Sequence, residues 1–176
     1  MNRDALLAFD ALAVAVAAAV IDVRERRIPN WLTYPAVLLG SLLRWCFFSW
    51  RGLGSAIAGC LLAGGVVLLF YAVRAMGAGD VKLLAAIGSL IGPRDAVVVL
   101  LATAIAGGLM ALVWVAVLRR FSATLRNLGS VLWFHSSSGW KTHPELNLDN
   151  PSALRMPYGL AIATGTLYAF LAIWRR

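Results

Sequence analysis

Charge is scarce in this sequence, and negative charge most of all. Charged residues make up 14% of its 176 residues, and Asp and Glu together number eight. The two cysteines, Cys46 and Cys60, lie in apolar surroundings without a C-x-x-C spacing, which excludes a zinc ribbon or a disulfide framework. The composition is instead 61% hydrophobic, far above that of soluble domains. We therefore expect an all-α polytopic membrane protein.

The net charge of +8 does not indicate nucleic-acid binding here. In a soluble chain such an excess of Lys and Arg would suggest a nucleic-acid partner, but here most basic residues lie between apolar runs, where they orient helices in a bilayer. The expected partner of these side chains is the lipid surface.

Six apolar runs are candidates for membrane-crossing helices: 6–23, 31–48, 53–73, 83–91, 96–118 and 156–174. The first has Asp4 and Asp10 where a secretion signal would be basic, so we expect a retained helix rather than a cleaved signal peptide. In the third, Ser55, Gly59 and Ala63 recur at every fourth position, a stripe suited to close helix packing in lipid. Arg44, near the end of the second, is expected to snorkel to the headgroups.

The fourth run is too short to cross a bilayer unless its helix begins near Asp80. Six crossings place both termini on one side of the membrane, and the positive-inside rule favours a cytoplasmic turn at 24–27. In this topology Asp22, at the end of the first run, and Asp80 come to the same cytoplasmic face.

These two acids are the strongest functional candidates. Ionisable groups at membrane depth are costly and usually functional. Gly77 and Gly79 flank Asp80, and because they lack a Cβ the backbone there can turn with positive φ and another chain can approach closely. Two neighbouring carboxyls share one proton, so one can act as a base towards water and the other as an acid towards an amide carbonyl. The pattern indicates aspartic-protease chemistry, which needs no metal or cofactor.

Three alternatives compete with this interpretation. Asp10 could replace Asp22 as the partner of Asp80, although twelve residues of helix place it about 18 Å away. The two acids could be interface residues paired with Arg24 and Lys82. They could also relay protons or cations in a small transporter.

The one long polar stretch, 119–155, is expected to be a cytoplasmic loop. Phe121, Leu125, Leu128 and Leu132 recur at helical spacing between basic residues, which predicts an amphipathic helix on the membrane surface. His135, His143 and Glu145 match no familiar metal-binding spacing, so we interpret them as loop residues.

Three motifs resemble those of a known protease family. Residues 77–80 (G-A-G-D) fit the G-x-G-D signature of intramembrane aspartyl proteases, and residues 79–83 (G-D-V-K-L) look like the type IV prepilin peptidase version. Asp22 followed by residues 27–30 (R-I-P-N) is similar to the first catalytic motif of these peptidases, and residues 157–159 (P-Y-G) are similar to an element of their last helix. The motifs occur in family order across nearly the whole chain.

The resemblance implies a prepilin leader peptidase with Asp22 and Asp80 as its catalytic pair. It implies that prepilin or pseudopilin precursors are cut after a glycine, between the leader and an apolar helix, at the cytoplasmic face of the bacterial inner membrane. The residues implied to support the site or bind substrate are Pro29, Asn30, Gly77, Gly79, Lys82, Pro157, Tyr158 and Gly159. Lys82 is expected to meet headgroups or an acid rather than take part in catalysis.

The resemblance is to the short form of the family. Long bifunctional members carry an N-terminal cysteine-tetrad region and also N-methylate the new pilin terminus, and Cys46 and Cys60 do not reproduce that region. The sequence looks like the short form found with tight-adherence (Flp-type) pilus systems, which implies cleavage without methyl transfer. We expect residues 1–176 to form one transmembrane protease domain, and the sequence indicates no particular oligomeric state.

Overall fold

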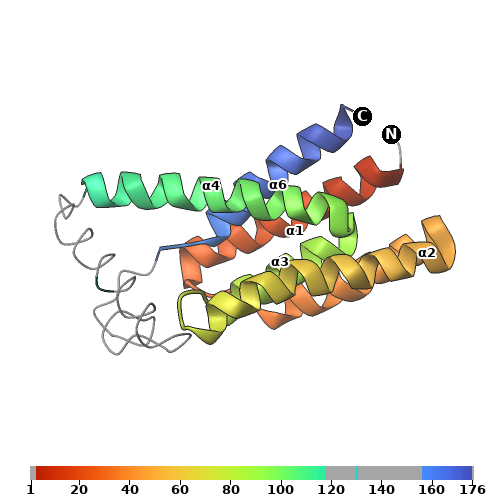
Figure 1. Cartoon of the computed structure of the whole chain (residues 1–176), viewed down its shortest axis with the longest axis horizontal. Helices are drawn as coiled ribbons and strands as arrows, with labels where there is room; N and C mark the ends of the chain where they lie inside the picture. The colour runs from red at the N-terminus through yellow and green to blue at the C-terminus, as the bar shows by residue number, and fades with distance from the viewer. Residues whose placement is uncertain (1–2, 118–129, 131–155, 176) are drawn as a thin grey trace.

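The computed structural model describes residues 3–117, 130 and 156–175, and its secondary-structure elements are all α-helices. This confirms the predicted all-α class (Figure 1). The helices are α1 (Arg3–Glu25), α2 (Asn30–Ala72), α3 (Ala78–Ile91), α4 (Pro93–Val117) and α6 (Gly159–Trp174). The predicted loop at 119–155 and its amphipathic helix lie outside the described residues, Ser130 apart.

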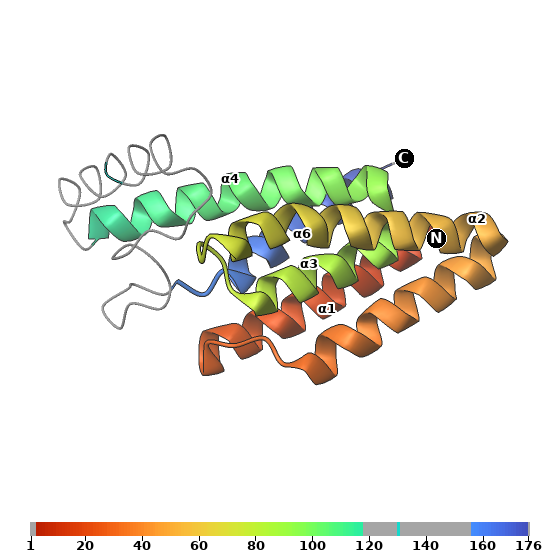
Figure 2. The ribbon, with the colours of Figure 1, turned by 60° about the horizontal axis from the view of Figure 1, so that its bottom comes forward.

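Helix α2 accounts for two of the predicted crossings because it bends sharply at Ser49. The backbone there has φ 55° and ψ −147°, which is not helical, and the second half runs back alongside the first (Figure 2). Gly52 permits the tight bend, because a Cβ at this position would collide with the main-chain oxygen of Arg44. The five helices of the described residues therefore account for the six predicted segments.

Many large apolar side chains lie on the outer surface of the bundle, as expected for a bundle in lipid. On α1 the buried residues are mostly alanines, whereas Phe9, Val16 and Val20 are exposed. Leu101, Ile105 and other large residues of α4 are exposed in the same way. Helices α1, α2 and α4 are long and apolar enough to cross a membrane. The protein is a multi-pass membrane protein, since an aqueous solvent would not tolerate this much exposed apolar surface.

Close packing of α2 on α3 follows from the predicted small-residue stripe. A Cβ at Gly59 would strike the main-chain oxygen of Gly88, and a Cβ at Gly88 would strike that of Gly59. Ala63 lies against Gly88 as well, and Ser55 against Gly92. The stripe in the third run therefore serves the close helix contact that it predicts.

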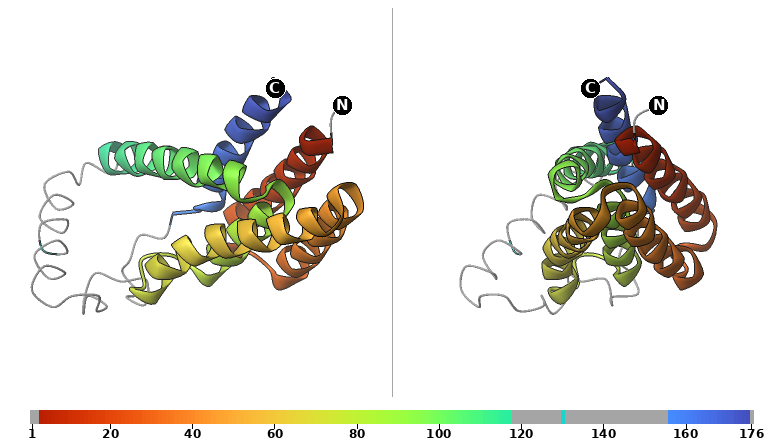
Figure 3. Two further views of the ribbon diagram at one scale, coloured as in Figure 1. Left: turned by 45° about the vertical axis from the view of Figure 1, so that its right-hand side comes forward. Right: turned by 90° about the vertical axis from the view of Figure 1, so that its right-hand side faces the viewer.

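Helix α3 is short but occupies the middle of the bundle. It contacts all four other helices, and its residues 83, 84 and 86–91 are all buried. The helix begins at Ala78, two residues before Asp80, as the short fourth run predicts. The end-on view in Figure 3 shows the other helices arranged around it.

The helix ends fall into two groups at opposite ends of the bundle (Figure 1). The start of α1, the bend of α2, the α3–α4 turn and the end of α6 share one end, which also holds both chain termini. The end of α1, the start of α3 and the start of α6 share the other. Asp22 and Asp80 therefore lie at the same end, as the topology predicts.

One expectation about α2 is wrong. Arg44 does not snorkel outward: it is only 8% exposed, and its Nη1 donates a hydrogen bond to the main-chain oxygen of Leu90, 2.9 Å away. The bend at Ser49 turns the second half of α2 back over this position, so the guanidinium group is enclosed by helices instead of reaching solvent.

Candidate active site

Asp22 lies near the end of α1 and is held by the start of α6. Its side chain is 8% exposed, and the N–H of Gly159 donates to its Oδ2 at 2.8 Å. A Cβ on Gly159 would stand 3.0 Å from the Asp22 Cβ and 3.2 Å from the Cα of Ala19, so glycine permits this approach. The first N–H groups of a helix lack partners within the helix and favour an anion. The start of α6 therefore supplies a main-chain donor to the Asp22 carboxyl.

Asp80 lies in the first turn of α3 and also binds a helix-terminal N–H. Its Oδ2 accepts a hydrogen bond of 3.2 Å from the N–H of Gly77, the residue before the helix. The side chain is partly buried, and the charge of Asp22 acts on it. Each acid therefore has one main-chain donor and a second carboxyl nearby.

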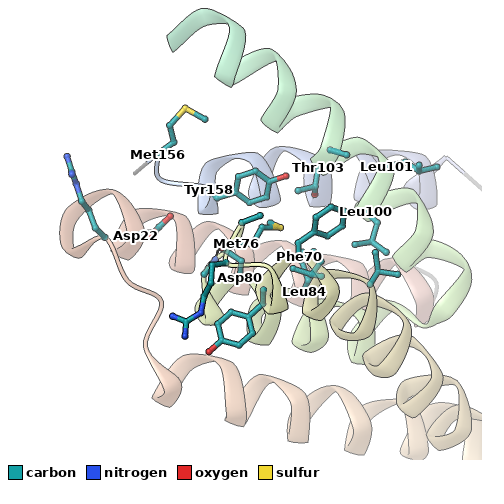
Figure 4. A pocket seen from close by; sticks show the side chains of 18 residues that line it. Asp22, Phe70, Met76, Asp80, Leu84, Leu100, Leu101, Thr103, Met156 and Tyr158 are labelled. Atoms are coloured by element: carbon teal, nitrogen blue, oxygen red, sulfur yellow. Dashed lines mark hydrogen bonds between the residues drawn. The ribbon is translucent and has the colours of Figure 1, made fainter. Parts of the chain in front are cut away.

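Both acids line one cleft of about 850 Å³ (Figure 4). Its lining also includes Arg26 and Arg74, and its walls are mostly apolar. The apolar side chains come from the second half of α2, the start of α3, α4 and the segment before α6: Val66, Val67, Phe70, Met76, Leu84, Leu100, Leu101 and Met156. The cleft thus combines a pair of acids with a long hydrocarbon surface.

Tyr158 projects into the cleft between the acids and α4 (Figure 4). Its ring lies against Gly107, where a Cβ would come within 2.7 Å of ring carbon Cε2. A tyrosine hydroxyl is protonated at neutral pH. It can therefore donate a hydrogen bond to a ligand in the cleft.

The three predicted motifs contact one another. Lys82 Nζ donates to Asn30 Oδ1 at 2.8 Å and lies 5.1 Å from the centre of the Tyr34 ring. Gly79 lies against Ile28, where a Cβ would come within 3.0 Å of the Ile28 Cβ. These contacts join the second motif to the first, and the bond from Gly159 to Asp22 joins the third to the first.

The supporting prolines stand next to helix starts. Pro29 immediately precedes α2, with φ −76° and ψ 147°, and its carbonyl accepts the N–H of Leu32. Pro157 lies just before α6, and its carbonyl accepts the N–H of Leu160. Both prolines therefore fix the backbone at the start of a helix. Because proline has no N–H, neither can donate a main-chain hydrogen bond to the acids.

One expectation about the glycines needs correction, and Lys82 has a partner that the sequence did not predict, the amide of Asn30. Gly77 has φ −78°, and among the described glycines only Gly92 has positive φ, so Gly77 and Gly79 are not needed for a left-handed turn. Their small size serves contacts within the chain, with the Asp80 carboxyl in one case and Ile28 in the other.

Sequence reasoning did not find most of the cleft wall. Thr103 is 2% exposed and lines the cleft, and its hydroxyl has no hydrogen-bond partner among the described residues. The basic character of Arg26 and Arg74 is visible in the sequence, but nothing in the sequence indicates that α4 faces the acids.

The described part of the chain contains no cluster of three His, Cys, Asp or Glu residues that could hold a metal ion. His135, His143 and Glu145 lie outside that part.

An all-α membrane bundle that brings two acids to one cleft belongs to the general class of polytopic membrane proteins with a buried polar site. The chain matches the type IV leader peptidase family over residues 10–112, a range that includes both acids. The chain belongs to this family. No solved structure shows a significant match to it.

Curated relatives carry the corresponding description. A prepilin leader peptidase/N-methyltransferase from Aeromonas hydrophila is 37% identical over 105 residues, which cover 55% of this chain and 36% of that protein. Proteins of the same description from Burkholderia pseudomallei strains 1026b and K96243 are 36% identical over 119 residues, covering 62% of this chain and 37% of theirs. The matched part therefore spans little more than a third of these relatives.

Proposed function

We propose that this protein is an aspartic endopeptidase that removes the leader peptide of type IV prepilin-like precursors, with Asp22 and Asp80 as its catalytic pair. The observation that carries the proposal is the meeting of the two acids in one cleft, each with a main-chain donor from the start of a helix. Family membership supports the peptidase activity.

In this mechanism the pair holds one proton between its two carboxyls. The ionised carboxyl takes a proton from a water molecule, and the protonated one donates to the carbonyl oxygen of the scissile amide. The tetrahedral intermediate then collapses as the leaving nitrogen receives a proton. Tyr158 is placed to donate a hydrogen bond to the substrate within the cleft.

The shape of the cleft supports a substrate with a polar segment next to an apolar one. Besides the two acids, the cleft is lined by Val66 and Phe70 of α2 and by Leu100 and Leu101 of α4. A precursor with a polar leader and an apolar helix would place its cleavage site at the acids and its helix along these walls. The site would lie at the cytoplasmic face of the inner membrane, in line with the positive-inside distribution of Lys and Arg.

The proposal covers cleavage and not methyl transfer. The relatives' description includes an N-methyltransferase activity, but the matched residues cover 36–37% of those proteins. An acid pair hydrolyses an amide without a methyl donor, so the chemistry of this cleft accounts for the peptidase activity alone.

A cleavage assay with a co-expressed prepilin tests the proposal. Asp22→Asn and Asp80→Asn each remove one carboxyl while keeping its shape, so each should lower the cleavage rate by about 10²–10⁴-fold. Asp10→Asn is the matched control. Asp10 also lies on α1, but about 18 Å along the helix from Asp22, so this variant should cleave almost normally. Cleavage that survives in either pair variant removes that residue from the mechanism.

The transporter alternative is tested with the same purified protein. The described residues that line the cleft include no third acid to pass a proton onward. In liposomes the wild-type protein should cleave prepilin without proton or cation flux. Flux that both Asn variants abolish, in the absence of proteolysis, would contradict the peptidase assignment.

A further inference from the structure

The segment 26–30, which joins α1 to α2, lies against the first turn of α3 (Figure 2). It directly follows the end of α1, which carries Asp22, and the first turn of α3 carries Asp80. The mechanism proposed above uses the two acids but assigns no part to the contact between these segments. This contact joins the two elements whose spacing sets the distance between the acids.

Two side chains of the 26–30 segment contact α3, one on each side of Asp80 in the chain. Ile28 is 9% exposed and packs on Gly79, where a Cβ would come within 3.0 Å of the Ile28 Cβ. Asn30 Oδ1 accepts a hydrogen bond of 2.8 Å from Lys82 Nζ. Gly79 immediately precedes Asp80 and Lys82 follows it after one residue, so the two contacts bracket the acid.

The 26–30 segment has little conformational freedom between these contacts. Pro29 stands between Ile28 and Asn30, and a proline ring restricts both its own φ and the backbone of the residue before it. At the other end, the N–H of Arg26 donates to the main-chain oxygen of Asp22 at 2.8 Å. The segment therefore links the backbone of one acid to the helix turn of the other through a short, restricted path.

The first turn of α3 needs support from outside the helix. The first N–H groups of a helix have no partners within it, and helix ends fray. The close packing of α3 on α2 is centred on Gly88, about two turns beyond Asp80. The contacts with Ile28 and Asn30 hold the turn that this packing leaves at the end of the helix.

Lys82 is directed towards α2 and not towards the cleft. Besides its bond to Asn30, its ammonium group lies 5.1 Å from the centre of the Tyr34 ring, one turn further along α2. None of Ile28, Asn30 and Lys82 is among the described residues that line the cleft. An effect of these side chains on catalysis would therefore pass through the acids and not through contact with substrate.

We propose that Lys82 and Asn30 are positioning residues of the acid pair. Their hydrogen bond, together with the contact of Ile28 with Gly79, holds Asp80 at a working distance from Asp22. The inference rests on the proposed peptidase function. Loss of the bond should slow the catalytic step, which depends on the spacing of the carboxyls, and should leave substrate binding unchanged.

Cleavage kinetics of the purified full chain with a prepilin substrate test the proposal. Lys82→Met removes the donor and Asn30→Ala removes the acceptor, so each should lower kcat about 3- to 30-fold with KM unchanged. Because one bond is lost in both, the double variant should lose no more than Lys82→Met alone. Asn30→Asp keeps an acceptor oxygen and should retain nearly the wild-type kcat.

The matched control removes a polar contact that does not reach α3. Glu25 pairs with Arg27 in an exposed ion pair of 3.3 Å, so Glu25→Gln should cleave at the wild-type rate. Wild-type kinetics in Lys82→Met or Asn30→Ala would overturn the proposal. Losses that add in the double variant, or a raised KM at constant kcat, would overturn it as well, since they indicate separate contacts with substrate.

Cross-linking gives a second readout that needs no catalysis. Cysteines replace Asp22 and Asp80 in a chain whose Cys46 and Cys60 are alanine, and a short bifunctional thiol reagent joins them. Lys82→Met should lower the yield of this link several-fold, and the exposed Asn30→Ala, which should fold normally, should reproduce the fall. An unchanged yield in both overturns the positioning role even where proteolysis is confirmed. A lower yield supports it even where the Asp→Asn variants still cleave and the peptidase mechanism fails.

Discussion

The position of the Asp22 carboxyl depends on the lack of a side chain at Gly159. Gly159 can donate its N–H to Asp22 only because nothing projects from its Cα towards Asp22 and Ala19. The two residues are 137 positions apart, so no local pattern in the sequence predicts the bond. The geometry makes the P-Y-G element part of the acid site rather than a simple helix start.

Gly159→Ala should lower the prepilin cleavage rate. The added Cβ forces the start of α6 away from Asp22, and a displacement of about 1 Å at a catalytic group costs up to 10²-fold in rate. We expect about a 10- to 100-fold lower kcat in a purified system, with the protein still present in the membrane.

Gly108→Ala is the matched control for this prediction. Gly108 lies in α4 with open space at the position of a Cβ, so the variant should cleave at the wild-type rate. A wild-type rate for Gly159→Ala as well would show that the Gly159 bond does not position Asp22.

At the residue scale, the rarity of charge in the sequence singles out Asp22 and Asp80 as candidates. It does not predict which residues the buried or bonded charged side chains contact. Asp80 stood out because acids are few and its flanks are apolar. The amide of Asn30 as the partner of Lys82, and the enclosure of Arg44, depend on how α2 folds back on itself. Such contacts between distant segments leave no periodic signal.

At the scale of the helices, α3 is held by close packing against α2. Main-chain atoms of Gly59 and Gly88 face each other without intervening side chains, and α2 and α3 form the most extensive contact between any two described helices. Since Asp80 is at the start of α3, this packing also fixes the depth of the acid. The small-residue stripe of α2 predicts a close helix contact. The sequence does not indicate that Gly88 of α3 is the residue on the other side of that contact.

Gly59→Ala should destabilise the protein more than Gly65→Ala. A Cβ at Gly59 meets main-chain atoms that cannot move aside, so we expect the free energy of unfolding to fall by roughly 1–3 kcal/mol. Gly65 lies on the same helix with open space around it, and alanine there should be neutral or slightly stabilising. Thermal unfolding in detergent measures both, and equal melting temperatures would contradict the packing account.

At the scale of the whole molecule, the two ends of the bundle differ. One end holds the acid pair in a mostly apolar cleft, and the other holds a smaller cleft around Arg44. Run lengths and the turn residues between them predicted the number of segments and the common end of Asp22 and Asp80. They did not predict which helices wall the cleft, because α4 has apolar residues on all sides and no face that identifies its neighbours.

The convergence of Asp22 and Asp80 within one molecule is the claim on which the account depends, and cysteine cross-linking measures it most directly. Asp22→Cys and Asp80→Cys are combined in a chain in which Cys46 and Cys60 are replaced by alanine, and a short bifunctional thiol reagent is applied in membranes. Mass spectrometry should then find an intramolecular link between the two positions. The Asp10→Cys and Asp80→Cys pair, with Asp10 about 18 Å further along α1, should give no link. No link in the first pair, or equal linking in both, would contradict the account.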